Sequence, residues 1–175
     1  PSDTGRETVF GSADDSFAET DVLSFDALIE HDMDGAVLRN RTRIADYDKF
    51  YQNVFPGAVN SAGSMVSISA YNNLTERQNI FNQTDLIFDI SQGDIIHRML
   101  VGAELGRQDT ENFRETGYFG APGSTTTSQS VSVDNPQPTL PIHFRQSAGD
   151  ADNDGVADTV ALYVQDQMHI GEKWQ

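Results

Sequence analysis

The feature that most constrains this chain is the stretch from 79 to 108, where apolar and polar residues alternate on both sides of a short turn at 91–94. Before the turn, one face of the alternation holds Thr84, Leu86, Phe88 and Ile90, with Ile87 as an exception on the opposite face. After the turn, the matching residues are Met99, Val101, Ala103 and Leu105. Successive side chains of a strand point to opposite faces, so the pattern predicts a β-hairpin with one apolar and one polar side.

A second hairpin is predicted upstream, where the alternation begins at Asp21 and Asp34-Gly35 is a strong turn signal. Its return strand, from 36 to about 52, carries a basic face made of Arg39, Arg41 and Arg43. Its first strand carries the acidic residues Asp26, Glu30 and Asp32. Opposite charges on neighbouring strands contribute about 0.2–1 kcal/mol a pair. On this hairpin alone, the water-exposed face of a soluble sheet is the favoured interpretation.

The connections between the predicted strands alternate in length. Residues 1–20 are polar and are expected to form a loop, whereas the two hairpin turns are tight. The stretches 52–73 and 109–140 hold Pro, Gly, Ser and Asn with little periodicity, and we expect both to be long loops. The last part of 52–73 is also compatible with the beginning of a strand. A last strand is expected from about 157 to 170, with a phase that the alternation does not fix.

This pattern predicts an all-β fold, an antiparallel up-and-down meander of about five strands with short turns on one edge and long loops on the other. Transmembrane β-barrels are built in this way. A soluble sandwich is the alternative, although its strands are usually shorter and closer together. Lipid outside would explain why only 37% of the residues are apolar. Five strands are too few to close a barrel, so we expect residues 1–175 to be part of a larger one.

Composition excludes several classes of protein. The net charge of −16 argues against nucleic acid as a partner, because phosphates require Lys and Arg. The chain has no cysteine, which excludes disulfides, zinc–thiolate sites and cysteine nucleophiles. No run of about 18 apolar residues predicts a transmembrane helix, and the start does not resemble a signal peptide. The chain opens at Pro1 and stops at Gln175 after a strand-like run, so we expect both ends to be cut from something longer.

Four segments resemble a known family. The strings LRNRTRIADYDKFYQNVFPGAVN, AYNNLTERQNIFNQTDLIF, LVGAELGRQDTENFRETGYF and ALYVQDQMHIGEKWQ are similar to the barrel region of TonB-dependent siderophore receptors, nearest to the catecholate type. The resemblance runs from about Arg6 to Gln175. It implies a receptor in the outer membrane of a gram-negative bacterium that imports ferric siderophores with energy relayed by TonB. Set against the family pattern, we expect residues 1–175 to hold about five barrel strands and to lack the plug domain, the TonB box and most of the barrel strands.

Aromatic and arginine residues near the predicted strand ends are candidates for contact with a ferric siderophore. Such side chains stack on catechol rings and pair with a negatively charged ferric complex. An aromatic girdle at the membrane interface is the alternative explanation. The ligand-binding candidates are Tyr51, Tyr71, Arg114, Tyr118, Phe119 and Arg145.

A carboxylate-rich segment offers a second kind of site. Alternating acidic residues with a glycine at the sixth position match the start of a calcium loop, but the twelfth position is Ala161 instead of Glu. An acidic surface loop is the other interpretation of Asp150, Asp152, Asp154 and Asp158. No catalytic or phosphate-binding motif is present, so we expect no enzyme and no cofactor. The alternatives to a receptor are a secreted, soluble β-rich module that binds calcium or another ligand, and a surface adhesin domain.

Overall fold

The computed structural model describes residues 5 and 7–170 of the chain. Residues 1–4 and 6, which belong to the predicted N-terminal loop, lie outside the described residues. Residues 171–175, at the end of the last segment that resembles the receptor family, lie outside them too. The strands are β1 (Phe17–Met33), β2 (Ala36–Val59), β3 (Met65–Gln92), β4 (Ile95–Phe119), β5 (Ser128–Ser132), β6 (Ile142–Arg145) and β7 (Asp152–Ile170). Within the described ranges there is no helix, and hence no helical segment long and apolar enough to cross a membrane.

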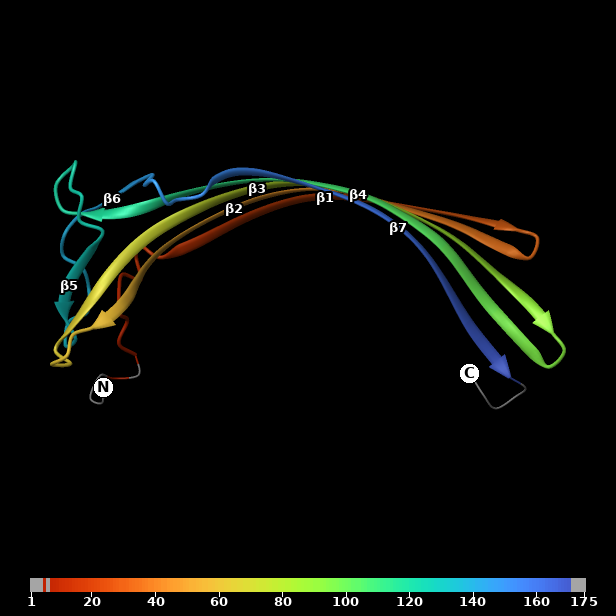
Figure 1. Ribbon diagram of the computed structural model, residues 1–175, viewed down its shortest axis with the longest axis horizontal. Helices are drawn as coiled ribbons and strands as arrows, with labels where there is room; N and C mark the ends of the chain where they lie inside the picture. The colour runs from red at the N-terminus through yellow and green to blue at the C-terminus, as the bar shows by residue number, and fades with distance from the viewer. Residues whose placement is uncertain (1–4, 6, 171–175) are drawn as a thin grey trace. The chain divides into compact units, whose positions relative to one another are not determined.

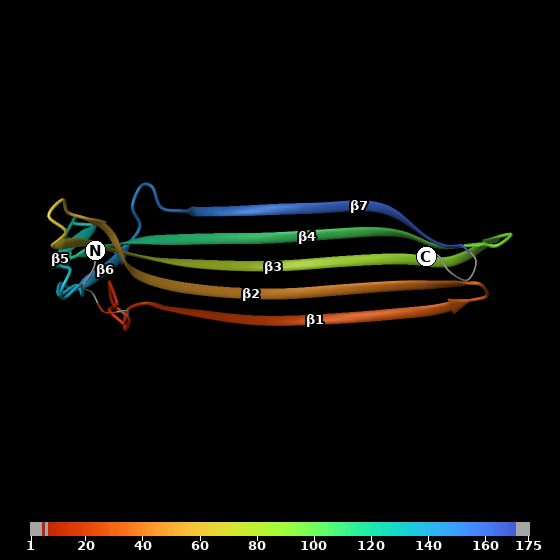
Figure 2. The same ribbon diagram turned by 90° about the horizontal axis from the view of Figure 1, so that it is seen from below.

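All seven strands belong to one sheet with the order β1-β2-β3-β4-β6, to which β5 adds beside β3 and β7 adds beside β4 (Figures 1 and 2). The strands β1 to β4 therefore form the predicted up-and-down meander, and β7 completes the five long strands. The all-β fold class is confirmed. The short strands β5 and β6 were not predicted; both pair antiparallel with their neighbours.

The predicted loop boundaries were wrong. Residues 52–59 extend β2 and residues 65–73 begin β3, so the expected loop of 52–73 contracts to a turn at 60–64. The side-chain oxygen Oδ1 of Asn60 stabilises this turn. It accepts hydrogen bonds from the backbone N–H groups of Ser64 at 2.9 Å and Met65 at 3.1 Å. Residues 109–119 likewise extend β4. Small and polar residues obscured these strands in the sequence, because their apolar residues alternate over only a few positions, as Val66, Ile68 and Ala70 do in β3.

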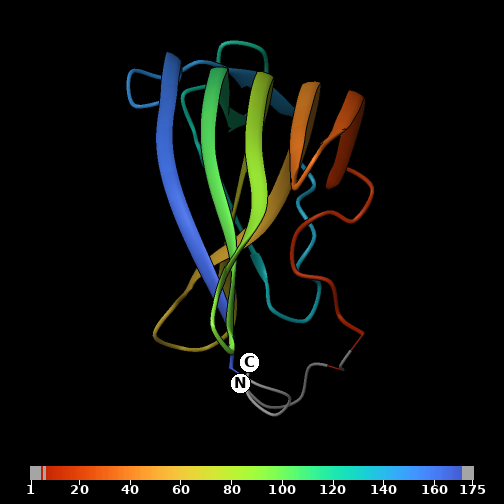
Figure 3. The same ribbon diagram turned by 90° about the vertical axis from the view of Figure 1, so that its right-hand side faces the viewer.

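The chain divides into two compact units, each with parts of the long strands. Unit 2 consists of Val22–Tyr47, Arg77–Thr110 and Gly155–Gln175 and contains both tight hairpin turns, which Figure 3 views from their own side. Gly35 and Gly93 occupy these turns with φ values of 85° and 63°. L-residues with a Cβ rarely adopt this conformation, so both predicted turns depend on glycine.

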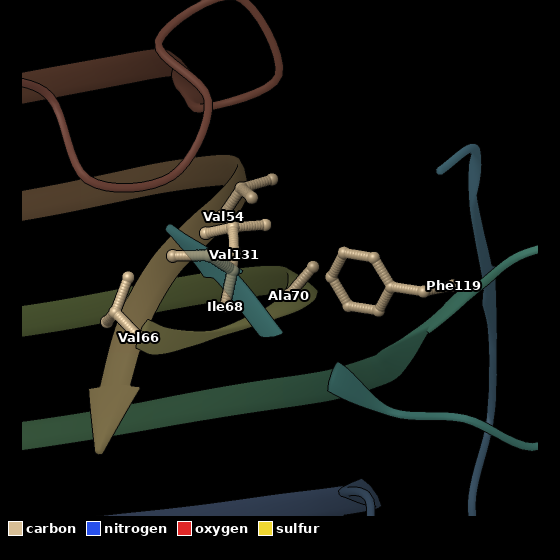
Figure 4. Packing of buried hydrophobic residues seen from close by; sticks show 6 residues of the cluster. All are labelled: Val54, Val66, Ile68, Ala70, Phe119 and Val131. Atoms are coloured by element: carbon tan, nitrogen blue, oxygen red, sulfur yellow. The ribbon is translucent and has the colours of Figure 1, made fainter. Parts of the chain in front are cut away.

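Unit 1 consists of Pro1–Asp21, Asp48–Glu76 and Glu111–Asp154 and contains the only cluster of buried apolar residues found among the described residues. Figure 4 shows this cluster, made of Val54, Val66, Ile68, Ala70, Phe119 and Val131. The alternating residues of β3 supply its centre, and β5 covers them through the pairing of Val66 with Val131. Phe10, Val133, Ile142 and Phe144 pack around its edge.

Candidate functional site

One face of the sheet in unit 2 is apolar and exposed. The strongest examples are Leu23 at 75%, Val160 at 76% and Leu162 at 83% exposure. These values are those of surface positions, although the residues alternate as a core face would. The other exposed large apolar residues with the same alternation include Phe25, Ile29, Leu38, Ile44, Val101, Leu105 and Val164. A contiguous apolar surface of this kind marks contact with a partner, a ligand or lipid.

Polar pairs between β4 and β7 bound this apolar band. On one side, His97 Nδ1 of β4 lies 2.8 Å from Asp166 Oδ2 of β7. On the other side, Arg107 Nη1 lies 3.8 Å from Asp158 Oδ1. His97 and Arg107 are ten residues apart, which is about 33 Å along a strand. A strand tilt of about 45° reduces this to about 23 Å, close to the apolar band of roughly 25 Å on transmembrane barrels.

Four polar residues interrupt the apolar band on β2 and β3, and they hydrogen-bond to one another. Asn40 Nδ2 donates to Asn82 Oδ1 at 3.1 Å and to Thr84 Oγ1 at 2.7 Å. Asn82 Nδ2 donates in return to Asn40 Oδ1 at 3.1 Å and to Thr42 Oγ1 at 2.7 Å. Both N–H groups of each amide are therefore used inside the network. This arrangement allows polar side chains to lie in an apolar band without an outside partner.

The opposite face of unit 2 is charged, as the sequence predicted. Arg43 forms a fork with Asp26 at 2.8 and 3.2 Å, and Arg39 pairs with Glu30. Arg98 binds Asp89 in the same way at 3.0 and 3.2 Å. Arg41, the remaining arginine of the predicted basic face, lines a cavity of about 260 Å³ together with Arg43, Phe81, Gln83 and Glu104.

A tyrosine of β7 settles the phase that the sequence left open. The Tyr163 hydroxyl donates to Asp85 Oδ1, and Gln83 Nε2 donates to Asp85 Oδ2 at 3.2 Å. Asp85 is only 5% exposed. The Tyr163 ring lies against Gly102, where any added Cβ would collide with it. Tyr163 therefore lies on the charged face, and Val160, Leu162 and Val164 lie on the apolar one.

Unit 1 brings three of the candidate ligand-binding residues together on one face of the sheet. The Tyr51 and Tyr71 rings meet edge to face, with centroids 5.6 Å apart. Phe55 adds a second edge-to-face contact to Tyr71 at 5.5 Å. The guanidinium of Arg114 lies over Tyr71, 4.2 Å from the ring centroid, and the ammonium of Lys49 lies 5.6 Å from that of Tyr51. We call these five residues the aromatic–cationic cluster.

A buried carboxylate supports this cluster. Arg114 Nε lies 3.5 Å from Asp150 Oδ1, and the Asp150 side chain is only 7% exposed. Thr116 Oγ1 donates to the carboxylate, 2.9 and 2.8 Å from its two oxygens, and the Ser147 backbone N–H donates to Oδ2 at 2.8 Å. Burial acts to raise the pKa of Asp150, but the hydrogen bonds from Ser147 and Thr116 outweigh it and hold this pKa below its ordinary value.

The candidates Tyr118 and Arg145 form a separate pair. The Arg145 guanidinium stacks on the Tyr118 ring, 3.5 Å from its centroid, and its Nη2 also donates to the carbonyl of Ser124. Tyr118 is 8% exposed, so little of this residue is open to solvent. Arg145 is partly exposed and is the more accessible member of the pair.

The candidate Phe119 was wrong as a ligand contact, because it is 1% exposed and packs in the core of unit 1. Tyr118 and Phe119 are adjacent in β4, so their side chains point to opposite faces. The acidic segment also differs from the expected loop, because Asp152, Asp154 and Asp158 belong to β7 and Asp150 bonds to Thr116 and Ser147. Among the described residues, no group of three or more His, Cys, Asp or Glu is placed to hold a metal ion.

The ligand-binding candidates omitted two members of the cluster, Lys49 and Phe55. Both share the alternation of Tyr51 on β2, so the period of two would have identified them. The sequence around Asp150 does not predict its contacts with Thr116 and Arg114, because they join the loop between β6 and β7 to β4.

The fold has close counterparts among solved structures, although no family model matches the sequence. The siderophore receptor PiuA from Acinetobacter baumannii superposes with a TM-score of 0.75 at 19% identity, over 90% of this chain and 24% of that chain. The ferric-catecholate import receptor Fiu from E. coli K12, in its open and closed forms, gives TM-scores of 0.66 and 0.67 at 22% identity. These matches cover 94% of this chain and 25% and 23% of the Fiu chains. The chain therefore spans about a quarter of the receptors whose fold it shares.

Proposed function

We propose that this chain forms part of the barrel wall of a TonB-dependent receptor that imports ferric siderophores through the outer membrane of a gram-negative bacterium. The observation that carries the proposal is the apolar band of unit 2, whose estimated height of about 23 Å fits the hydrocarbon-facing band of a transmembrane barrel. The fold shared with PiuA and Fiu supports it independently. A soluble module would bury Leu23, Val160 and Leu162, which are exposed here.

In this proposal the two faces of the sheet have different partners. The apolar face contacts lipid, and the face with Arg39, Arg43 and Arg98 lines the lumen. Each of these arginines is paired with a carboxylate, which suits a water-filled or plug-filled interior. A plug domain outside this chain would occupy the lumen and couple it to TonB. The chain itself supplies wall and loops, with no enzymatic step and no cofactor.

The aromatic–cationic cluster is the proposed ligand contact of this segment. Ferric catecholate complexes are anionic and present flat aromatic rings. The cluster combines two cations, Lys49 and Arg114, with the rings of Tyr51 and Tyr71 on one face. Cation–π and charge-assisted contacts of this kind recognise such a complex. Arg145 over Tyr118 offers a second contact of the same chemistry.

The test is iron uptake by the protein expressed from its whole reading frame, in a gram-negative host without catecholate receptors of its own. Cells receive ⁵⁵Fe³⁺ complexed with 2,3-dihydroxybenzoate. We expect membrane-localised protein and uptake that falls at least about tenfold in Arg114→Ala. Arg107→Ala is the matched control, because this arginine belongs to the same strand but lies on the apolar side; its uptake should equal that of wild type.

Two results would contradict the proposal. One is protein that fractionates as a soluble monomer, above all if calcium raises its melting temperature, since that is the behaviour of the secreted-module alternative. The other is membrane-inserted protein that takes up no iron from the catecholate complex.

A further inference from the structure

The loop between β6 and β7 is fastened to the sheet at the aromatic–cationic cluster. The backbone N–H of Arg114 donates to the carbonyl of Ala151 at 2.9 Å. The backbone N–H of Asp150 donates to the carbonyl of Ser147 at 3.0 Å, which closes a turn. The side chain of Asp150 then crosses to Thr116 of β4. Main-chain and side-chain bonds thus hold the same short segment against the same stretch of strand.

The position of Asp150 relative to Arg114 is unusual for an ion pair at a surface. The carboxylate is 7% exposed, whereas the Arg114 side chain is 43% exposed. The buried partner is held by bonds independent of the arginine, from Thr116 and from the Ser147 backbone. The Asp150 carboxylate is therefore held in place without the arginine, and the partly exposed Arg114 guanidinium is accessible to a ligand.

Arg114 has two neighbours that restrict where its guanidinium can lie. Its buried Nε lies 3.5 Å from Asp150 Oδ1, an ion-pair contact without hydrogen-bond geometry, and its guanidinium lies over the Tyr71 ring. An arginine with five donors in a rigid fork needs little further ordering once one edge is oriented. Ordering a binding group in advance lowers the entropy that binding would otherwise lose.

We propose that Asp150 is a positioning residue for Arg114: it holds the guanidinium over Tyr71 in the orientation that receives an anionic ferric complex. This inference rests on the proposed function of the cluster and adds to it the residue that sets its geometry. Asp150 touches no ligand itself. It acts through Arg114, and its own geometry depends on Thr116 and Ser147.

The proposal makes a prediction opposite in sign to that of simple electrostatics. If Asp150 only added negative charge near the site, removing that charge would strengthen the binding of an anion. If it positions Arg114, the same change weakens binding. Asp150→Asn is suited to the test because it keeps the side-chain shape and one acceptor oxygen for Thr116.

The experiment measures binding by the whole membrane-inserted receptor to two probes. One is the trianionic ferric complex of three catechol ligands, and the other is the neutral ferric complex of three acetohydroxamates. We expect Asp150→Asn to weaken binding of the trianionic probe on the order of tenfold, by analogy with the lower end of the effect of residues that orient metal-binding side chains. Binding of the neutral probe should change less. Circular dichroism and thermal melting identify any variant that fails to fold.

A double-mutant cycle provides the decisive control. Because Asp150 acts through Arg114, Asp150→Asn should have no added effect in the Arg114→Ala background. Thr116→Val, which removes the hydroxyl but keeps the carboxylate, should weaken binding in the same direction as Asp150→Asn.

Three outcomes are informative. Tighter binding of the trianionic probe by Asp150→Asn, or additive losses in the cycle, would overturn the positioning role. An unchanged affinity in Arg114→Ala would remove the cluster as the ligand site, and with it the role of Asp150. Absence of binding to both probes in wild type would overturn the proposed function itself.

Discussion

An arginine at Val101 tests whether the apolar face of unit 2 contacts lipid or water. Val101 lies in β4 on the apolar face and is 41% exposed. It follows His97 by four residues and precedes Arg107 by six. These separations correspond to about 13 and 20 Å along the strand, or about 9 and 14 Å across the band at a tilt of about 45°. Val101 is therefore near the middle of the proposed hydrocarbon region.

The expected cost of Val101→Arg depends strongly on what surrounds the side chain. At the midplane of a bilayer, an outward-facing arginine costs about 2–4 kcal/mol. At a water-exposed position, a surface substitution changes stability by no more than about 0.5 kcal/mol. The larger cost is a substantial part of a total stability of roughly 5–15 kcal/mol. The two environments thus predict results that a single measurement separates.

The assay is urea titration of the whole receptor folded into phosphatidylcholine vesicles, with Leu100→Arg as the matched control. Leu100 is the neighbour of Val101 in β4, and its side chain points to the charged face. The same charge is therefore added to the same strand at almost the same depth. We expect Val101→Arg to lower the free energy of unfolding by about 2–4 kcal/mol more than Leu100→Arg. Equal effects of the two substitutions would refute the assignment of the apolar face to lipid.

Three further predictions concern the packing of each unit and the protonation of Asp150. Gly102→Ala should lower the free energy of unfolding by about 1–3 kcal/mol, because the new methyl group displaces the Tyr163 ring; in a Tyr163→Ala background, urea titration should show a smaller loss. Ile68→Ala should cost about 2–5 kcal/mol in unit 1, because Ile68 is fully buried; amide exchange in β5 should accelerate, and unchanged exchange would contradict the core assignment. Since the pKa of Asp150 is lowered in the folded state, its contribution is present above the ordinary value of 3.8 and is lost as the pH falls through the lowered pKa. Hydrogen exchange in the loop 146–151 should therefore rise in acid, and an equal rise in Asp150→Asn would contradict this.

The alternation of side chains made part of this structure predictable. The two faces of the hairpin around 91–94 follow from the period of two in the sequence. So do the opposite charges that pair Arg39 with Glu30 and Arg43 with Asp26. The glycine turns were equally local signals. The same rule would have excluded Phe119 from the ligand group, because its neighbour Tyr118 already pointed to the other face.

The tertiary structure decided the extent of the strands and the composition of the site. Residues 52–59, 65–73 and 109–119 are strand although Pro, Gly and polar residues interrupt or shorten their apolar alternation. Pairing with neighbouring strands extends them, and the sequence of one segment alone does not report that pairing. The phase of β7 was likewise fixed only by the contact of Tyr163 with Asp85 across Gly102.

The sequence by itself determined that this protein is a sheet with one apolar and one charged face, because each strand carries that information in its own alternation. Only the tertiary structure decided which aromatics and cations meet. Tyr51, Tyr71 and Arg114 belong to three different strands, and Asp150 reaches them from a loop. Strand register and loop position set such distances, and both depend on contacts between residues distant in sequence.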